Sequence, residues 1–100
     1  MKLWLISQGI NNGYDTYDSA VVAAETELEA RQTYPSVGDF EYYYKDGSWF
    51  WTWDAHPELG AKKESGGCWA NNAEQVDLEY LGEAKPGTEA GVICASFNAG

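Results

Sequence analysis

The sequence has few of the residues from which metal centres and disulfide frameworks are built. It contains one histidine, His56, and two cysteines, Cys68 and Cys94. A metal centre needs several convergent ligands, and no histidine or cysteine pair here has ligand spacing. Two cysteines make no disulfide framework, so we expect two reduced thiols and no metal site.

Basic residues are also scarce. Six lysines and arginines stand against 16 acidic residues, which gives a net charge of −10. Such a chain repels nucleic acid and anionic membranes, so neither is an expected direct partner. A compact domain of this length is roughly 34 Å across, and duplex DNA carries about 20 charges over that distance. The chain can therefore compete for a basic groove if its charges lie on one side.

The N-terminal segment has no long hydrophobic run. Only four consecutive apolar residues, 3–6, precede the return of polar ones, and no small-residue cleavage pattern follows. The pattern predicts neither a signal peptide nor a membrane span. Gly66 and Gly67 precede no lysine-serine pair, so no nucleotide or other cofactor is expected.

Apolar residues are present in sufficient number for one core. Hydrophobic residues make up 44% and aromatic residues 15% of the 100 residues. This is the size of a single domain, so we expect residues 1–100 to fold as one. Residues 2–8 and 19–24 have the β-branched, aromatic and apolar content of two strands.

A helix is predicted to begin near Glu27. Thr26 and Glu29 form a capping box, in which the Thr26 hydroxyl accepts from the Glu29 N–H and the Glu29 carboxylate accepts from the Thr26 N–H. Glu27 and Arg31 stand four residues apart in the favourable order. Pro35 cannot continue a helix, so we expect about two turns.

Residues 40–53 predict a β-hairpin, because Asp46 and Gly47 lie between two aromatic runs. Pairing outward from this turn gathers six aromatic residues on one face. These are Phe40, Tyr42, Tyr44, Trp49, Trp51 and Trp53. Exposing them would leave on the order of 1,000 Å² of apolar surface, so we expect this face in the core. Tyr43 and Phe50, on the opposite face, are better candidates for contact.

Two further strands and one long loop are predicted in the remaining segments. Residues 76–80 alternate apolar and acidic side chains, which is typical of a half-buried antiparallel strand. Residues 91–97 are apolar on both alternations, as a central strand would be. Residues 54–74 have no periodicity and are expected to form a surface loop that carries Trp69 as an anchor. The elements together predict an α+β fold: a single domain with a mostly antiparallel sheet of about five or six strands and one short helix packed on one face.

The acidic residues are the main candidates for a binding surface. Asp77 and Glu79 lie two apart on the solvent face of their strand, about 7 Å from each other. Lysines and arginines placed to bind a nucleic-acid backbone could meet these carboxylates instead. The other reading is a surface that only keeps the chain in solution. The candidate partner-binding residues are Glu74, Asp77, Glu79, Glu83, Asp15, Asp18, Tyr43, Phe50 and Trp69.

No catalytic residues are predicted. A thiol nucleophile would need Cys68 or Cys94 beside His56, and Cys94 lies in a predicted core strand. Acidic pairs such as Asp15 with Asp18 have no calcium-loop spacing, and no wide substrate cleft is indicated. We therefore expect a binding protein, with the pair of Cys68 and His56 as the enzymatic alternative.

Residues 14–24, 26–31 and 91–100 resemble a family of small uncharacterised proteins of tailed bacteriophages and prophages. The resemblance lies at both ends of the chain, carries no catalytic residues with it, and implies action in the cytoplasm of a bacterial host. Small acidic proteins of phage accessory genes resemble anti-defence factors, among them anti-CRISPR proteins. The resemblance thus implies a stoichiometric inhibitor that binds a basic surface of a nuclease or CRISPR surveillance complex.

A second hypothesis is a structural or accessory phage protein that packs against another phage protein through the hairpin and the Trp69 loop. The sequence leaves the oligomeric state open. It also leaves open whether the acidic residues form one patch.

Overall fold

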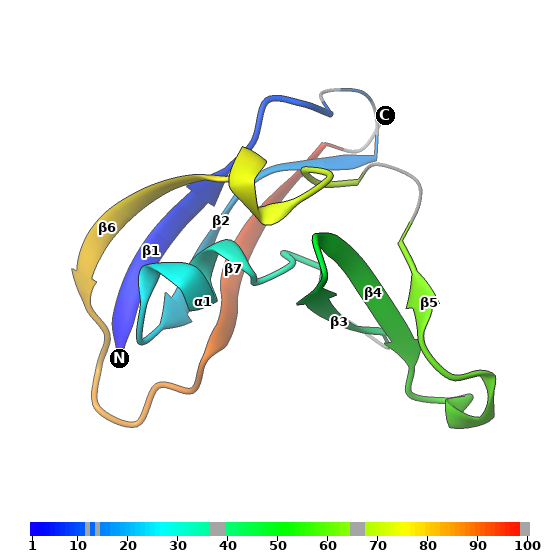
Figure 1. Cartoon of the computed structure of the whole chain (residues 1–100). Coiled ribbons are helices and arrows are strands. Elements are labelled where there is room, and N and C mark those ends of the chain that lie inside the picture. Colours follow the sequence, from blue (N-terminus) through cyan, green and yellow to red (C-terminus); the bar gives the residue numbers. More distant parts are fainter. Residues whose placement is uncertain (12, 14, 37–39, 65–67, 99–100) are drawn as a thin grey trace.

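The computed structural model describes residues 1–11, 13, 15–36, 40–64 and 68–98. The strands found there are β1 (Lys2–Ser7), β2 (Thr16–Ala24), β3 (Phe40–Lys45), β4 (Ser48–Trp53), β5 (Lys62–Lys63), β6 (Asp77–Glu83) and β7 (Gly91–Asn98) (Figure 1). The helices are α1 (Glu27–Arg31) and two single 3-10 turns, η1 (Pro57–Leu59) and η2 (Ala73–Gln75). No helix within these ranges is long and apolar enough to cross a membrane.

Four antiparallel strands form the larger sheet, sheet A, in the order β6-β1-β2-β7. The strands predicted at 2–8 and 19–24 are confirmed as β1 and β2, and β2 begins three residues earlier. Alternate residues of the two central strands are buried, such as Trp4 and Ile6 of β1 at 7% and 0% exposure and Ala20 and Val22 of β2 at 3% and 0%. This period of two defines an inner face of sheet A, which carries the core, and an outer face, which meets solvent.

The helix α1 begins where the sequence predicts and covers part of the inner face. The Thr26 hydroxyl accepts from the Glu29 N–H at 3.2 Å, as expected of the cap. The Glu29 carboxylate accepts from the Glu25 N–H at 3.2 Å. The capping box predicts the Thr26 N–H as this donor, so the donor lies one residue earlier than expected. The helix ends at Arg31, after little more than one turn, and only Ala30 is buried.

β3 and β4 form the predicted hairpin with the predicted register, from Phe40 opposite Trp53 to Lys45 opposite Ser48. Positive φ angles of 51° at Asp46 and 78° at Gly47 give the primed turn its handedness. The short β5 pairs with the other side of β4. The resulting sheet B has the order β3-β4-β5.

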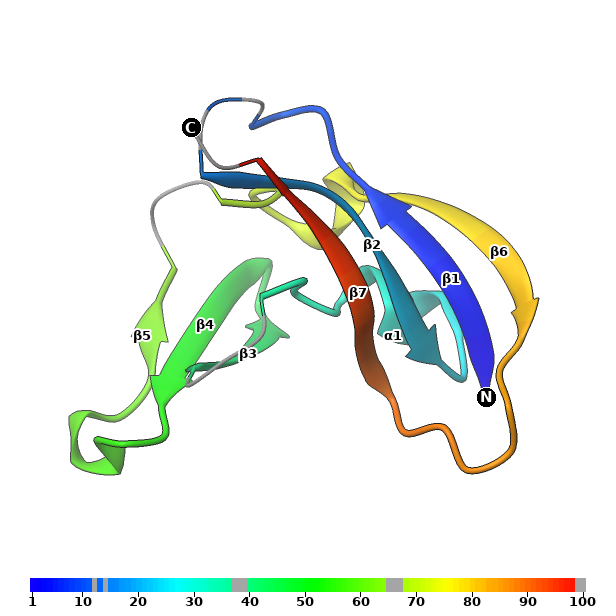
Figure 2. The ribbon, with the colours of Figure 1, turned by 180° about the vertical axis from the view of Figure 1, so that it is seen from behind.

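The seven strands form two sheets, where the sequence predicts one sheet of five or six strands. The mixed architecture with one short helix on a face of an antiparallel sheet is as expected. Figures 1 and 2 show sheet B set across from the inner face of sheet A instead of continuing its edge. Aromatic packing explains this placement: Tyr34 stacks on Tyr42 at 4.0 Å and meets Trp49 edge-on at 5.2 Å. In this position the hairpin buries Trp49 and packs Tyr42 and Tyr44 against the core.

Only half of the aromatic face of the hairpin enters this core. The residues nearest the turn belong to it, namely Tyr42, Tyr44 and Trp49. The other half makes a separate cluster, in which the Phe40 ring lies 5.3 Å from Trp51 and 5.8 Å from Trp53. Phe40 is 40% exposed. Burial of the whole face was therefore too broad an expectation.

The described residues of the segment 54–74 contain more secondary structure than the predicted surface loop. They include η1 and β5 and the beginning of η2, and three residues of the last part are buried. Trp69, Ala70 and Ala73 are 1%, 2% and 7% exposed. The prediction of an exposed Trp69 anchor is therefore wrong, because the indole fills space between the two sheets.

β7 lies at the edge of sheet A, so the prediction of a central strand is wrong. Val92 packs against the core, but Ile93 is 52% and Phe97 is 47% exposed, and Cys94 is exposed as well. The pattern indicated burial on both sides, but within the described residues β2 is the one strand that pairs with β7.

Candidate functional site

Two of the predicted contact residues lie side by side on the outer face of sheet A. Asp77 is opposite Ser7 of β1, and Glu79 is opposite Leu5. Because Trp4 and Ile6 occupy the inner face, the alternation directs both carboxylates to solvent. Both residues are exposed. The backbone beneath them is held by a paired strand, so they form a fixed pair.

Three other acidic residues lie at the same end of sheet A. Ser7 is opposite both Asp77 and Ser19, so Asp18, next to Ser19, is two strands away from Asp77. Two strand spacings correspond to about 10 Å. Asp15 directly precedes β2, and Glu74 lies in η2, just before β6. We call this group, consisting of Asp15, Asp18, Glu74, Asp77 and Glu79, the acidic end of sheet A.

Two interactions fix the start of β6. The Asn72 side chain caps η2 by accepting from the Gln75 N–H at 3.2 Å. The Arg31 guanidinium of α1 donates to the Val76 carbonyl, directly before Asp77. From the sequence, Arg31 is predicted only to pair with Glu27 along the helix. It ties the acidic end to the helix, a long-range contact that no local pattern indicates.

Glu83 does not join this group. The pairing of β6 with β1 shifts between Leu3 and Trp4, so Glu83 lies opposite Lys2 at the other end of the strand. Its carboxylate accepts from the Tyr80 hydroxyl at 3.1 Å. Tyr80 lies opposite Trp4, on the inner face, so the irregularity turns Glu83 away from Asp77 and Glu79.

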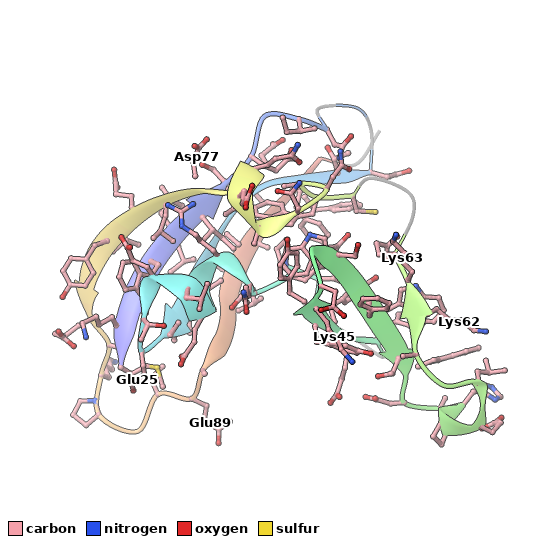
Figure 3. All side chains as sticks on the ribbon, in the orientation of Figure 1. Glu25, Lys45, Lys62, Lys63, Asp77 and Glu89 are labelled. Carbon is pink, nitrogen blue, oxygen red and sulfur yellow. The ribbon has the colours of Figure 1, made fainter. Side chains whose placement is uncertain are left out.

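Charge is unevenly divided between the two sheets. Residues 40–64, which include sheet B, carry five acidic and three basic residues, whereas the rest of the chain carries eleven and three. Figure 3 shows Lys45, Lys62 and Lys63 on sheet B, with Asp77 at one end of sheet A and Glu25 and Glu89 towards the other. The part of the chain outside residues 40–64 therefore carries most of the negative charge.

Tyr43 and Phe50 lie on the opposite side of the hairpin from the core, as predicted. Their rings stack at 5.5 Å, and Tyr43 is 40% exposed. Phe50 is opposite Lys63 of β5. These aromatic residues thus share a surface with a lysine and are separate from the acidic end.

Trp69 lines a cavity between sheet B and the segment 69–72. The cavity has a volume of about 330 Å³, and Ser48, Lys63, Glu64 and Asn71 also line it. The indole Nε1 of Trp69 has no hydrogen-bond partner among the described residues. The neighbouring backbone is well held, since Asn11 donates to the Trp69 carbonyl at 2.6 Å. Trp69 is therefore a core residue, and its side chain is not available as a surface contact.

Several ionisable groups near this cavity are shifted towards their neutral forms. Burial, together with the Glu64 carboxylate, raises the pKa of Tyr42 to about 12. The same two causes raise the pKa of Tyr34 above its ordinary range. Burial, then Glu64 and Asp15, raise the pKa of the Cys68 thiol. A thiol with a raised pKa is less often a thiolate at neutral pH and is a weaker nucleophile.

The described residues hold no group of three or more histidine, cysteine, aspartate or glutamate side chains arranged to bind a metal. His56 lies at the tip of sheet B, where its ring is 4.2 Å from Trp53. Its Nδ1 is 3.0 Å from the Glu58 carboxylate. Both cysteines are free. The neighbours of His56 are thus an indole and a carboxylate on the sheet B side.

The position of β7 at an unpaired edge of sheet A was not predicted from the sequence. Its signal was present: β7 contains no charged residue, whereas β3, β5 and β6 all do. A charge-free apolar strand is usually central, so the same signal produced the wrong prediction.

No protein family, curated protein or solved structure that was compared with the chain matches it.

Proposed function

We propose that this chain is a phage-encoded binding protein that inhibits a bacterial defence complex of the anti-CRISPR-like kind. It acts without catalysis, by occupying a basic nucleic-acid-binding or recruitment surface in the host cytoplasm. The observation that carries the proposal is the exposed pair Asp77 and Glu79 on the outer face of β6, with Asp18 two strands away. The net charge of −10 supports it.

The geometry suits an ionic contact. Carboxylates on a paired strand lose little backbone freedom when bound, so more of the interaction energy is retained than with a flexible tail. Successive outer-face carboxylates about 7 Å apart can each meet a lysine or arginine placed for a phosphate. Charge of one sign also speeds the encounter with a basic partner and makes it salt-dependent.

The test is affinity capture from infected bacteria that carry active defence systems, followed by mass spectrometry at low and high salt. The wild-type chain is compared with the Asp77→Lys, Glu79→Lys double variant. The expected result is a nuclease or surveillance subunit that the wild type retains at low salt, releases at high salt, and that the variant fails to capture.

A matched control separates local contact from total charge. The Asp54→Lys, Glu58→Lys variant changes net charge equally, at exposed positions on the sheet B side. It is expected to capture the same subunit. If the Asp77/Glu79 variant captures the subunit as well as the wild type does, the acidic end is not the binding surface. If the wild type captures no protein, the inhibitor function is contradicted.

One observation favours a second candidate, an accessory phage protein that binds another phage protein. Phe40 and Tyr43 of the hairpin are each 40% exposed, on opposite faces of sheet B. Exposed aromatic residues are enriched at protein interfaces. Finding the chain in purified virus particles at fixed copy number, or capturing only structural phage proteins, supports this candidate over the first.

A further inference from the structure

The four edge strands of the two sheets are not equally protected. β3 carries Glu41 and Lys45, β5 is Lys62–Lys63, and β6 carries three acidic residues. Charges on an edge strand oppose pairing with another chain. β7 (Gly91–Asn98) has no charged residue and no proline. It is the one described edge without this protection.

The side chains of β7 also lack the cover that their composition requires. Ile93 and Phe97 are 52% and 47% exposed, whereas Ala20 and Val22 of the neighbouring β2 are 3% and 0% exposed. A strand that is apolar on both faces is typical of the interior of a sheet. β7 therefore has the sequence of a central strand in an edge position.

The backbone of β7 is available along a continuous stretch. The pairing of β2 with β7 shifts at two places, at Ile93 of β7 and at Asp18 of β2. The second extra residue lies on β2, so residues 94–98 of β7 themselves follow one another without a bulged residue. Within the described chain no strand pairs with the other side of β7, as Figure 2 also shows. Every second N–H and C=O of an edge strand points away from its one neighbour.

We propose that β7 is a strand-addition site, at which an extended segment of the partner protein pairs as a fifth strand of sheet A. Main-chain hydrogen bonds from residues 94–98 supply affinity, and the exposed side chains of Ile93 and Phe97 supply apolar contact. The inference rests on the proposed function in one respect, that the partner is basic.

The flanking charges define the segment that fits. Asp18 of β2 lies beside the pairs Ser19–Ser96 and Tyr17–Phe97, near the end of β7. At its beginning, Glu89 is two residues away, and Glu41 lines a cavity with Gly91 and Val92. All three carboxylates are on exposed residues. The occupant is therefore an extended segment with a small or apolar centre and lysine or arginine at both ends.

A second copy of this chain is a poorer occupant. In antiparallel pairing of two β7 strands, Asp18 of each copy would approach the end that carries Glu89 and Glu41 of the other. Like charges placed opposite each other oppose association, and each copy has a net charge of −10. The edge is thus complementary to a basic strand and not to itself.

The test measures binding of the synthetic peptide KKTVSVTKK to the full chain by titration calorimetry, with hydrogen exchange to locate it. The expected result is salt-sensitive binding and slower exchange in residues 91–98. Two control peptides define the cause. EETVSVTEE and KKTPSPTKK are each expected to bind at least about tenfold more weakly, because one reverses the charges and the other removes backbone donors.

β6 is the internal control, because it is the other edge of the same sheet and carries more charge. Slower exchange in β6 without β7, equal binding of the proline peptide, or no binding of KKTVSVTKK at millimolar concentration overturns the proposal. So does a concentration-dependent dimer with β7 already protected, since the occupant is then a second copy. The assay uses no bacterial complex, so its failure leaves the capture experiment on Asp77 and Glu79 to be judged separately.

Discussion

Sheet A and sheet B bury their aromatic and apolar residues in different ways. The difference distinguishes the residues that stabilise the fold from those that are available to bind a partner. Sheet A buries Ile6 on its inner face and carries the Asp77 carboxylate on its outer face. Sheet B buries Trp49 but leaves Phe40 40% exposed on the same side of the hairpin. Sheet A thus combines a buried inner face with exposed carboxylates on its outer face. One part of sheet B packs against the core, and the other part is a surface of exposed aromatic and lysine side chains.

The largest expected effect is a difference in the free energy of unfolding between variants in the two halves of the hairpin. Trp49→Ala empties a site that is 3% exposed and leaves the Ala70 carbonyl without its 2.9 Å indole bond. It is expected to lower the free energy of unfolding by about 3–5 kcal/mol. Trp53→Ala, on the same strand but outside the core cluster, is expected to cost about 1 kcal/mol.

Urea unfolding of both variants measures this contrast. If Trp49→Ala does not fold, Trp49→Phe keeps most of the volume and gives a smaller loss that is still measurable. Equal losses for the two tryptophans would contradict a core that joins the sheets at Trp49.

The next effect concerns pH and the junction between the sheets. Tyr42 has its pKa raised to about 12 by burial and by Glu64, so the folded state favours the neutral phenol. An unfolded tyrosine titrates near pH 10, so this stabilisation is complete below about pH 10 and is lost as pH rises towards about 12. The expected loss for one group is on the order of 1–2 kcal/mol after allowance for solvent screening.

Urea unfolding at a series of alkaline pH values tests the assignment. Tyr42→Phe should be less sensitive over this range, because it has no phenol to ionise. The remaining sensitivity is expected to include Tyr34, whose pKa is raised by the same burial and the same carboxylate. An unchanged pH dependence in Tyr42→Phe would place the sensitive group elsewhere.

The smallest effect lies on the sheet A side, at the helix cap. α1 has only five residues, so it depends on its cap and on packing more than on helix propensity. Thr26→Ala removes the acceptor for the Glu29 N–H and is expected to cost about 1 kcal/mol. Thr26→Ser keeps that acceptor and should restore most of the loss, as measured by thermal unfolding.

Local chemistry in the sequence predicted local structure well. The positive-φ turn at Asp46 and Gly47 determined the hairpin register, and the hydroxyl of Thr26 determined where α1 begins. Both depend on residues within a few positions of each other. The position of Asp77 and Glu79 on a solvent face followed from the same alternation that places Leu78 and Tyr80 opposite Ile6 and Trp4 of the inner face.

Long-range packing could not be read in the same way. Whether the hairpin extends sheet A or faces it depends on contacts such as Tyr34 on Tyr42, between segments whose relative placement no periodicity encodes. That choice made β7 an edge strand and buried Trp69. It also separated Tyr43 and Phe50 from the acidic end, so the predicted contact residues occupy two surfaces.

The most direct test of the central claim is the hydrogen-exchange footprint of the chain in complex with the partner recovered by capture. We expect slower exchange on sheet A, in residues 74–79 and 91–98, with little change in residues 48–53 and 62–63 of sheet B. A footprint confined to sheet B would contradict it, and would assign binding to the exposed aromatic and lysine surface instead.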